Sequence, residues 1–120
     1  MQRDMDLVRK ILFETEKAPY EGGWIDLEIE GYEPNAISYH VLLLDEAGLL
    51  RATELSSLGV GPEWRPERLT WAGHEFIEAA RDEGRWEKAK KIMWEKSGGM
   101  AFEVLTALLV RFVNDAVMGK

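Results

Sequence analysis

The chain has 120 residues, of which 46% are hydrophobic and 31% charged, and it contains no cysteine. This composition is typical of a globular protein with one hydrophobic core, and it excludes disulfides, thiolate metal sites and a cysteine nucleophile. The formal net charge of -7 argues against indiscriminate binding of nucleic acid, because lysine and arginine supply the contacts to phosphate.

The two ends of the chain predict neither a secretion signal nor a membrane span. The N-terminal stretch, MQRDMDLVRK, is charged rather than apolar. The longest apolar stretch near the C-terminus is interrupted by Glu103, Arg111 and Asp115. We therefore expect a cytoplasmic protein without a membrane span, folded as a single domain over residues 1–120.

The first third of the chain predicts a helix and then a strand. From Asp4 to Lys17 apolar residues recur at helical spacing, and Asp4 is placed to cap the first turn. The stretch WIDLEIEG then alternates between apolar and acidic residues, which predicts a strand from Ile25 to Ile29 with one solvated face. The alternative is a short helix at the same place.

The middle of the chain predicts a second helix and a hairpin. Pro34 can open the helix, Ile37, Val41 and Leu44 fall on one face, and Gly48 ends it. The stretch RATELSSLGVGPEWRPERLTW then predicts a strand, a loop rich in glycine and proline, and a returning strand. We expect the returning strand to end at Trp71.

Three helical segments are predicted after the hairpin. Ala72–Arg81 and Arg85–Lys96 are parted around Gly84, and SGG separates them from a last helix, Met100–Met118. The apolar face of the last helix is wider than a surface helix needs, so we expect either a core helix or a homodimer contact. The residues expected to form that contact are Leu105, Leu108, Leu109 and Phe112.

The order of these elements and two local phrases resemble a winged helix of the α+β class. AISYHVLLLDEAGLL is similar to the recognition helix and following strand of ArsR- and MarR-type regulators. RLTWAGHEFIEAA is similar to the returning wing strand and next helix of PadR- and MarR-like regulators, where Leu-Thr-x-x-Gly marks the turn. The resemblance implies a helix, a strand, a recognition-type helix, a two-stranded wing and C-terminal helices.

A closer resemblance covers almost the whole chain. The phrases RDMDLVRKIL, ISYHVLLLDEAGLL and LTWAGHEFIEAARD are similar to a bacterial and prophage family, domain of unknown function 2513. This resemblance implies a winged-helix-like fold and a mobile-element context. It implies no activity, which has to be argued from the site.

The side chains expected to contact nucleic acid or a partner come from the outer face of the predicted recognition helix and from the wing. They are Asn35, Ser38, Tyr39, Leu42, Arg51, Trp64, Arg65 and Arg68. The first hypothesis is a transcriptional regulator that contacts double-stranded DNA through this set, because asparagine and serine read base edges and arginine contacts phosphate. The helix offers no arginine to read guanine, and Asp45 and Glu46 close it with negative charge.

Acidic residues dominate the same part of the chain. Between Glu21 and Glu67 there are ten acidic residues and two basic ones, Arg51 and Arg65. The alternative hypothesis is therefore an acidic winged helix that binds a basic host or phage protein. Its expected contact surface consists of Asp26, Glu28, Glu30 and Glu63.

No pattern in the chain indicates catalysis, so we expect a non-enzymatic protein without a cofactor. His74 and Glu78 have the spacing of two metal ligands on a helix, but one histidine and one carboxylate are too few for a metal site. His40 lies on the apolar face of its helix and is expected to be a hydrogen-bonded core residue. Trp64 is expected to be an exposed aromatic at the wing tip; the alternative is that it covers the hairpin.

Overall fold

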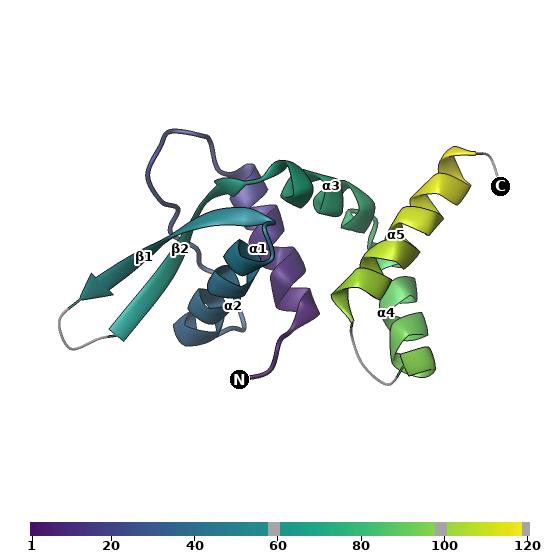
Figure 1. Cartoon of the computed structure of the whole chain (residues 1–120), viewed down its shortest axis with the longest axis horizontal. Helices are drawn as coiled ribbons and strands as arrows, with labels where there is room; N and C mark the ends of the chain where they lie inside the picture. Colours follow the sequence, from purple (N-terminus) through teal and green to yellow (C-terminus); the bar gives the residue numbers. More distant parts are fainter. Residues whose placement is uncertain (58–60, 98–100, 119–120) are drawn as a thin grey trace. The chain divides into compact units, whose positions relative to one another are not determined.

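The computed structural model describes residues 1–57, 61–97 and 101–118 of the chain (Figure 1). Within these ranges it contains five helices and one two-stranded antiparallel sheet. Their bounds are α1 Met5–Lys17, α2 Pro34–Glu46, β1 Leu50–Ser57, β2 Gly61–Leu69, α3 Trp71–Ala80, α4 Glu83–Ser97 and α5 Phe102–Val117. The expected α+β class is thereby confirmed, and the arrangement is compatible with a winged helix.

The chain divides into two compact units, Met1–Glu75 and Phe76–Lys120, and the boundary falls within α3. The first unit holds α1, α2 and the β1–β2 hairpin, which carry the expected contact residues. The second unit holds α4 and α5. None of the helices in the described ranges is both long and apolar enough to cross a lipid bilayer.

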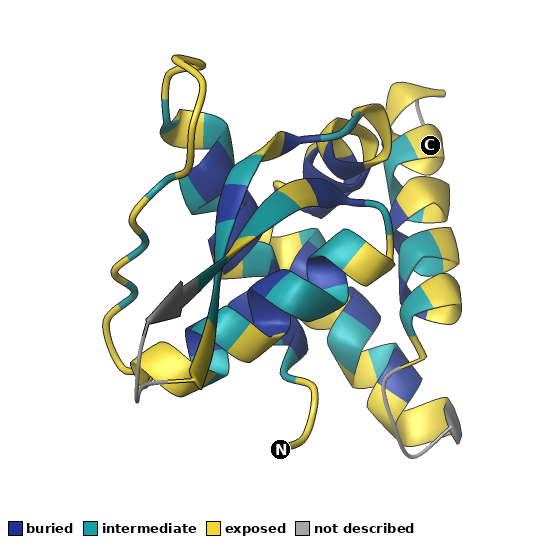
Figure 2. Cartoon of the chain, turned by 60° about the vertical axis from the view of Figure 1, so that its left-hand side comes forward, coloured by how far each residue is buried: buried dark blue, intermediate teal, exposed yellow. Residues whose placement is uncertain are grey.

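Helix α1 begins where the sequence predicts. The Asp4 carboxylate accepts hydrogen bonds from the backbone N–H groups of Asp6 and Leu7, at 2.9 and 3.1 Å, and so caps the first turn. The helix contacts α2 and β2, and its apolar face is buried (Figure 2). The buried residues of this face are Met5, Leu7, Val8, Ile11 and Leu12.

Helix α2 also has the predicted limits. Pro34 occupies its first turn, where the missing N–H has no helical acceptor to lose. Beyond its C-terminal end, Gly48 takes a left-handed φ of 78°, which lets the chain turn into β1. The face formed by Ile37, Val41 and Leu44 is buried, as the helical spacing predicts.

His40 links α2 to the start of α1. Its side chain is 1% exposed. Nε2 accepts the backbone N–H of Asp4 at 2.8 Å, and Nδ1–H donates to the carbonyl oxygen of Ala36 at 2.8 Å. These two bonds assign a neutral ring with its proton on Nδ1. The prediction that His40 is a hydrogen-bonded core residue is confirmed.

The predicted hairpin is confirmed as well. β1 and β2 pair antiparallel from Leu50↔Leu69 to Ser57↔Gly61. The loop at the tip, residues 58–60, lies outside the described residues. Between Leu69 and Pro66 β2 contains one residue more than the facing part of β1, so Glu67 forms a bulge. The bulge brings Pro66 and Leu69 to one buried face although they are three residues apart.

The segment between α1 and α2 is an extended loop, so the predicted strand from Ile25 to Ile29 is wrong. A backbone hydrogen bond from Ile25 N–H to the carbonyl oxygen of Pro66, at 2.8 Å, joins this loop to β2. Residues 18–33 also contain no helix, so they supply no counterpart of the backbone-crossing helix of a helix-turn-helix.

The outer edge of β2 explains why no third strand forms. Alternate residues of a strand direct their backbone polar groups to the same side. Because the Ile25 N–H bonds to the carbonyl oxygen of Pro66, the backbone polar groups of Pro62, Trp64 and Pro66 are directed toward the loop and away from β1. Proline has no N–H, and the N–H of Trp64 already donates to Ser38 Oγ at 2.8 Å. This edge therefore has no amide hydrogen left for an incoming strand.

Helix α3 starts close against the turn that joins α2 to β1. The Thr70 hydroxyl donates to the carbonyl oxygen of Gly48 at 2.5 Å and accepts the Gly73 N–H at 3.1 Å, which ends β2 and caps the helix. Trp71 therefore begins α3, and the prediction that the returning strand extends to it is wrong. A Cβ on Gly73 would lie 1.9 Å from the Leu49 carbonyl oxygen, so only glycine fits this position of the Leu-Thr-x-x-Gly phrase.

The second unit contains an aromatic cluster and the α4–α5 helix pair. Phe76 stacks on Phe102 with 5.2 Å between ring centroids and meets the buried Trp86 edge-on at 6.3 Å. The predicted break around Gly84 is shifted, because Asp82 Oδ1 accepts an N–H at the start of α4 and Gly84 lies in its first turn. Residues 98–100, where the separating glycines and the start of the last helix were expected, lie outside the described residues.

Helix α5 buries the centre of its apolar face within the chain. Leu105 and Leu109 are fully buried, whereas Leu108 and Phe112 are half-buried. The core alternative therefore holds for Leu105 and Leu109, and a contact with a second copy would have to use other side chains of this helix. The homodimer itself stays a prediction.

We predict that Gly73→Ala lowers the free energy of unfolding by about 1–3 kcal/mol or more, because the new methyl group must displace the Leu49 carbonyl. Urea denaturation followed by circular dichroism measures the change. Gly84→Ala is the matched control, since its Cβ would meet only the Asp82 side chain at 3.2 Å and alanine favours a helix. Equal stability of the two variants would contradict the close approach at position 73.

Candidate recognition site

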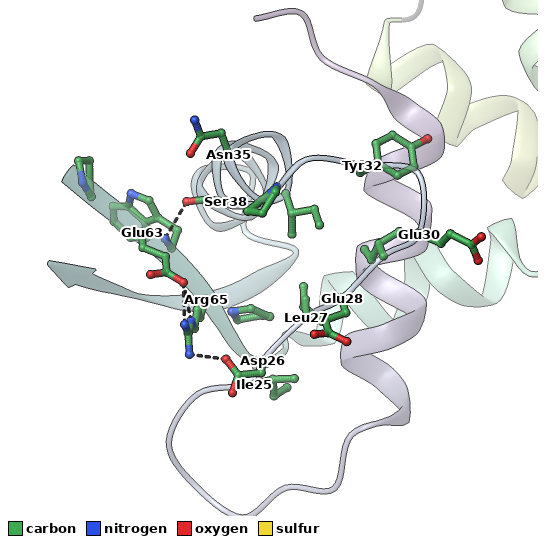
Figure 3. A pocket seen from close by; sticks show the side chains of 16 residues that line it. Ile25, Asp26, Leu27, Glu28, Glu30, Tyr32, Asn35, Ser38, Glu63 and Arg65 are labelled. Carbon is green, nitrogen blue, oxygen red and sulfur yellow. Dashed lines mark hydrogen bonds and ion pairs between the residues drawn. The ribbon is translucent and has the colours of Figure 1, made fainter. Parts of the chain in front are cut away.

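A pocket of about 620 Å³ lies between the loop that precedes α2, the N-terminal half of α2, and β2 (Figure 3). This volume is in the usual range of ligand-binding pockets. Its apolar lining includes Ile25, Leu27, Ile29, Ile37, Pro62, Trp64 and Pro66. Its charged lining consists of Asp26, Glu28, Glu30, Glu63 and Arg65. We call it the acidic pocket.

The acidic pocket gathers the whole acidic surface expected from the sequence. Asp26, Glu28 and Glu30 are exposed, whereas Ile25, Leu27 and Ile29 between them are half-buried. The alternation in the sequence thus survives as an alternation of burial along an extended loop, without the strand. Glu63 comes from β2, which forms another wall of the pocket.

Arg65 is held by two of these carboxylates. Its Nε and Nη2 donate to Glu63 Oε1 at 2.9 and 2.7 Å, and Nη1 pairs with Asp26 Oδ1 (Figure 3). The hydrogen bond to Glu63 raises the pKa of Arg65 above its ordinary value; burial opposes this, and the charge of Asp26 adds to it. The guanidinium therefore stays charged but is directed at protein carboxylates, which ties the loop to the wing.

Ser38 braces α2 against the wing. Its hydroxyl oxygen accepts the backbone N–H of Trp64 at 2.8 Å, and both residues line the acidic pocket. Trp64 is half-buried, so the prediction that it is an exposed aromatic of the wing is wrong. The exposed tryptophans are Trp24, Trp71 and Trp94.

The other expected contact residues divide into two groups. Asn35 is exposed and lines the acidic pocket with Ser38, Trp64 and Arg65. The remainder lie outside the pocket lining: Tyr39 and Leu42 on α2, and Arg51 and Arg68 at the base of the hairpin. Arg51 and Arg68 are paired across the two strands and are both exposed.

Several lining residues were not expected from the sequence. Pro62, Pro66 and Tyr32 line the acidic pocket without having been singled out. The signal for the prolines is their spacing of four within a strand, which places both missing N–H groups on one edge. Tyr32 carries no such signal.

The pair with metal-ligand spacing forms no metal centre in the described residues. Glu78 pairs with Arg81 at 2.9 Å, the surface ion pair that its position favours. Within residues 1–57, 61–97 and 101–118, no three histidine, aspartate or glutamate side chains are grouped so that they could hold a metal ion.

The sequence matches known proteins over nearly its whole length. A family model described as "Hypothetical protein (DUF2513)" matches residues 2–99. A protein of Haemophilus influenzae (strain ATCC 51907 / DSM 11121 / KW20 / Rd), named "Uncharacterized protein", is 31% identical over 116 residues, which is 96% of this chain and 98% of that protein. No solved structure matches the chain. The family resemblance seen in the sequence phrases is therefore confirmed.

We predict that Ser38→Ala lowers the free energy of unfolding by about 0.5–1.5 kcal/mol, because the Trp64 N–H loses its acceptor. The same substitution should accelerate hydrogen exchange at the Trp64 amide, measured by NMR. Ser38→Thr keeps a hydroxyl group and serves as the control. An exchange rate at Trp64 that is unchanged in Ser38→Ala would contradict the bracing bond.

Proposed function

The chain belongs to the DUF2513 family, and we propose that it is a non-enzymatic, winged-helix-like recognition module that binds a basic segment of a partner protein. The observation that carries this proposal is the charge of the acidic pocket. Of its described lining residues, four are carboxylates and one is an arginine, and that arginine is already paired with two of the four.

The remaining carboxylates favour a cationic partner. Glu28 and Glu30 are exposed and have no cationic side chain paired with them in the part of the chain that the structure describes. Two exposed carboxylates that lie two residues apart on one extended loop attract a cationic ligand. A pocket lined by one sign of charge also raises the local concentration of oppositely charged ligands and increases their association rate.

Double-stranded DNA is the second candidate partner, supported by the exposed Arg51 and Arg68 at the base of the hairpin and by the exposed Asn35 and Tyr39 on α2. A typical DNA site makes on the order of six to ten phosphate contacts. The expected wing arginines amount to three, and Arg65 already faces two carboxylates. A phosphate backbone laid across α2 and β2 would also meet the acidic pocket, which repels it.

We predict that the double variant Glu28→Lys, Glu30→Lys weakens binding of a labelled lysine- and arginine-rich peptide by roughly tenfold. Each exposed pair contributes about 0.2–1 kcal/mol, and reversal replaces attraction by repulsion. Fluorescence anisotropy measures the affinity. Glu75→Lys, Glu95→Lys is the control, since both residues are exposed helix positions outside the pocket and the net charge changes equally.

The same assay with a labelled DNA duplex separates the two candidates. For a protein-binding module, the duplex should show no binding at low salt while the basic peptide binds. Duplex binding that falls steeply with salt and is lost in Arg51→Ala, Arg68→Ala would instead support the DNA candidate and overturn the first proposal.

A further inference from the structure

We infer that the acidic pocket receives an arginine side chain of the partner, with its guanidinium among the carboxylates and its aliphatic stem against the apolar wall. This inference rests on the proposed function and specifies which chemical group the pocket recognises. Three observations support it: the excess of carboxylates among the charged side chains of the lining, the blocked edge of β2, and the aromatic and aliphatic lining.

Among the charged side chains that line the pocket, hydrogen-bond acceptors predominate. Asp26, Glu28, Glu30 and Glu63 are acceptors only when ionised, and each carboxylate can accept several bonds. Arg65 is the cationic donor of the lining, and its Nε, Nη1 and Nη2 are already bonded to Glu63 and Asp26. A ligand that is rich in donors and has no acceptor complements such a lining, and a guanidinium has five N–H donors and no acceptor.

The edge of β2 has the same character. On the side that faces the loop, Pro62 and Pro66 have no N–H, and the Trp64 N–H is bound by Ser38. The backbone there offers carbonyl oxygens without amide hydrogens. A ligand that needs donors from the protein, such as a phosphate or a carboxylate, finds none on this edge, whereas a guanidinium can donate to it.

The rest of the lining suits arginine better than lysine. The half-buried Ile25, Leu27 and Ile29 and the buried Ile37 provide an apolar surface for a long aliphatic stem. Trp64 provides an aromatic ring, on which a planar guanidinium stacks and an ammonium does not. Figure 3 shows Asp26 and Glu63 against Arg65 at one end of the pocket and Glu28 farther along the loop, whereas the Glu30 side chain extends away from them.

The inference is tested on the full chain with three labelled peptides. Each peptide consists of glycine and serine, with arginine, lysine or citrulline at alternate positions. Citrulline has nearly the shape of arginine and no charge. Anisotropy should give the arginine peptide at least about fivefold tighter binding than the lysine peptide, because bidentate pairing and stacking are specific to the guanidinium. The citrulline peptide should not bind measurably.

Substitution of the aromatic ring provides the second readout. In Trp64→Leu, which keeps the backbone N–H bonded to Ser38, the preference for arginine over lysine should fall to about twofold or less. Trp94→Leu, an exposed position on α4, is the control and should keep the preference. An amide NMR spectrum checks that both variants fold. If Trp64→Leu does not fold, the indole N–H signal of Trp64 in the unaltered chain must shift on addition of the arginine peptide.

The outcomes separate this inference from the proposed function. Equal binding of the arginine and lysine peptides, or a preference that survives Trp64→Leu, overturns the inference and leaves the proposed function standing. Absence of binding by both basic peptides overturns the proposed function, and the inference falls with it. Tighter binding of a DNA duplex than of either peptide has the same effect and favours the DNA candidate.

Discussion

The chemistry of one strand edge determines the architecture of the first unit. On its outer side β2 lacks the N–H groups of Pro62 and Pro66, and its one amide there is bound to Ser38. A chain segment that runs alongside this edge is therefore joined by few backbone bonds, such as the one from Ile25 to Pro66. Because the segment is not drawn into a ladder, space remains between it, α2 and β2, and that space is the acidic pocket.

The same edge also protects the hairpin. Exposed strand edges recruit other strands, and proteins commonly block them with proline or with covering segments. Here both devices occur on one strand: two prolines remove donors, and a serine from α2 binds the donor between them. The helix that would read DNA in a winged-helix regulator is thus fastened to its own wing. It contributes one wall of a pocket, in addition to presenting an outward face.

Much of the fold could be predicted from the sequence because local signals agree with the tertiary structure. The cap at Asp4, the proline that opens α2 and the glycine that follows it act within a few residues, so their effects can be read along the chain. The alternation from Ile25 to Ile29 led to the wrong prediction of a strand. A period of two indicates that the segment has two unlike faces, but it does not indicate whether another strand pairs with it. The edge of β2 cannot serve as that pairing partner, because Pro62 and Pro66 have no N–H.

The candidate site could be predicted only as a set of charges. The acidic residues were expected to share a surface, and they line one pocket. The pairing of Arg65 with Asp26 joins residues on separate elements, so neither spacing nor composition reveals it. Trp64 is likewise half-buried beside α2, whose Ser38 accepts its backbone N–H, whereas the flanking glycines and prolines indicated only a loop. Periodicity along the chain does not predict how side chains on different elements lie relative to one another.

The bulge at Glu67 has a consequence for how this hairpin tolerates changes in length. Ala52 pairs with Pro66 and Arg51 with Arg68, on either side of Glu67. Deletion of Glu67 would therefore join the two paired segments of β2 without changing which residues of β1 they face. Deletion elsewhere in β2 would invert every side chain beyond the gap. Glu67 therefore marks the place in the strand where a related chain one residue shorter can keep the same inward and outward faces.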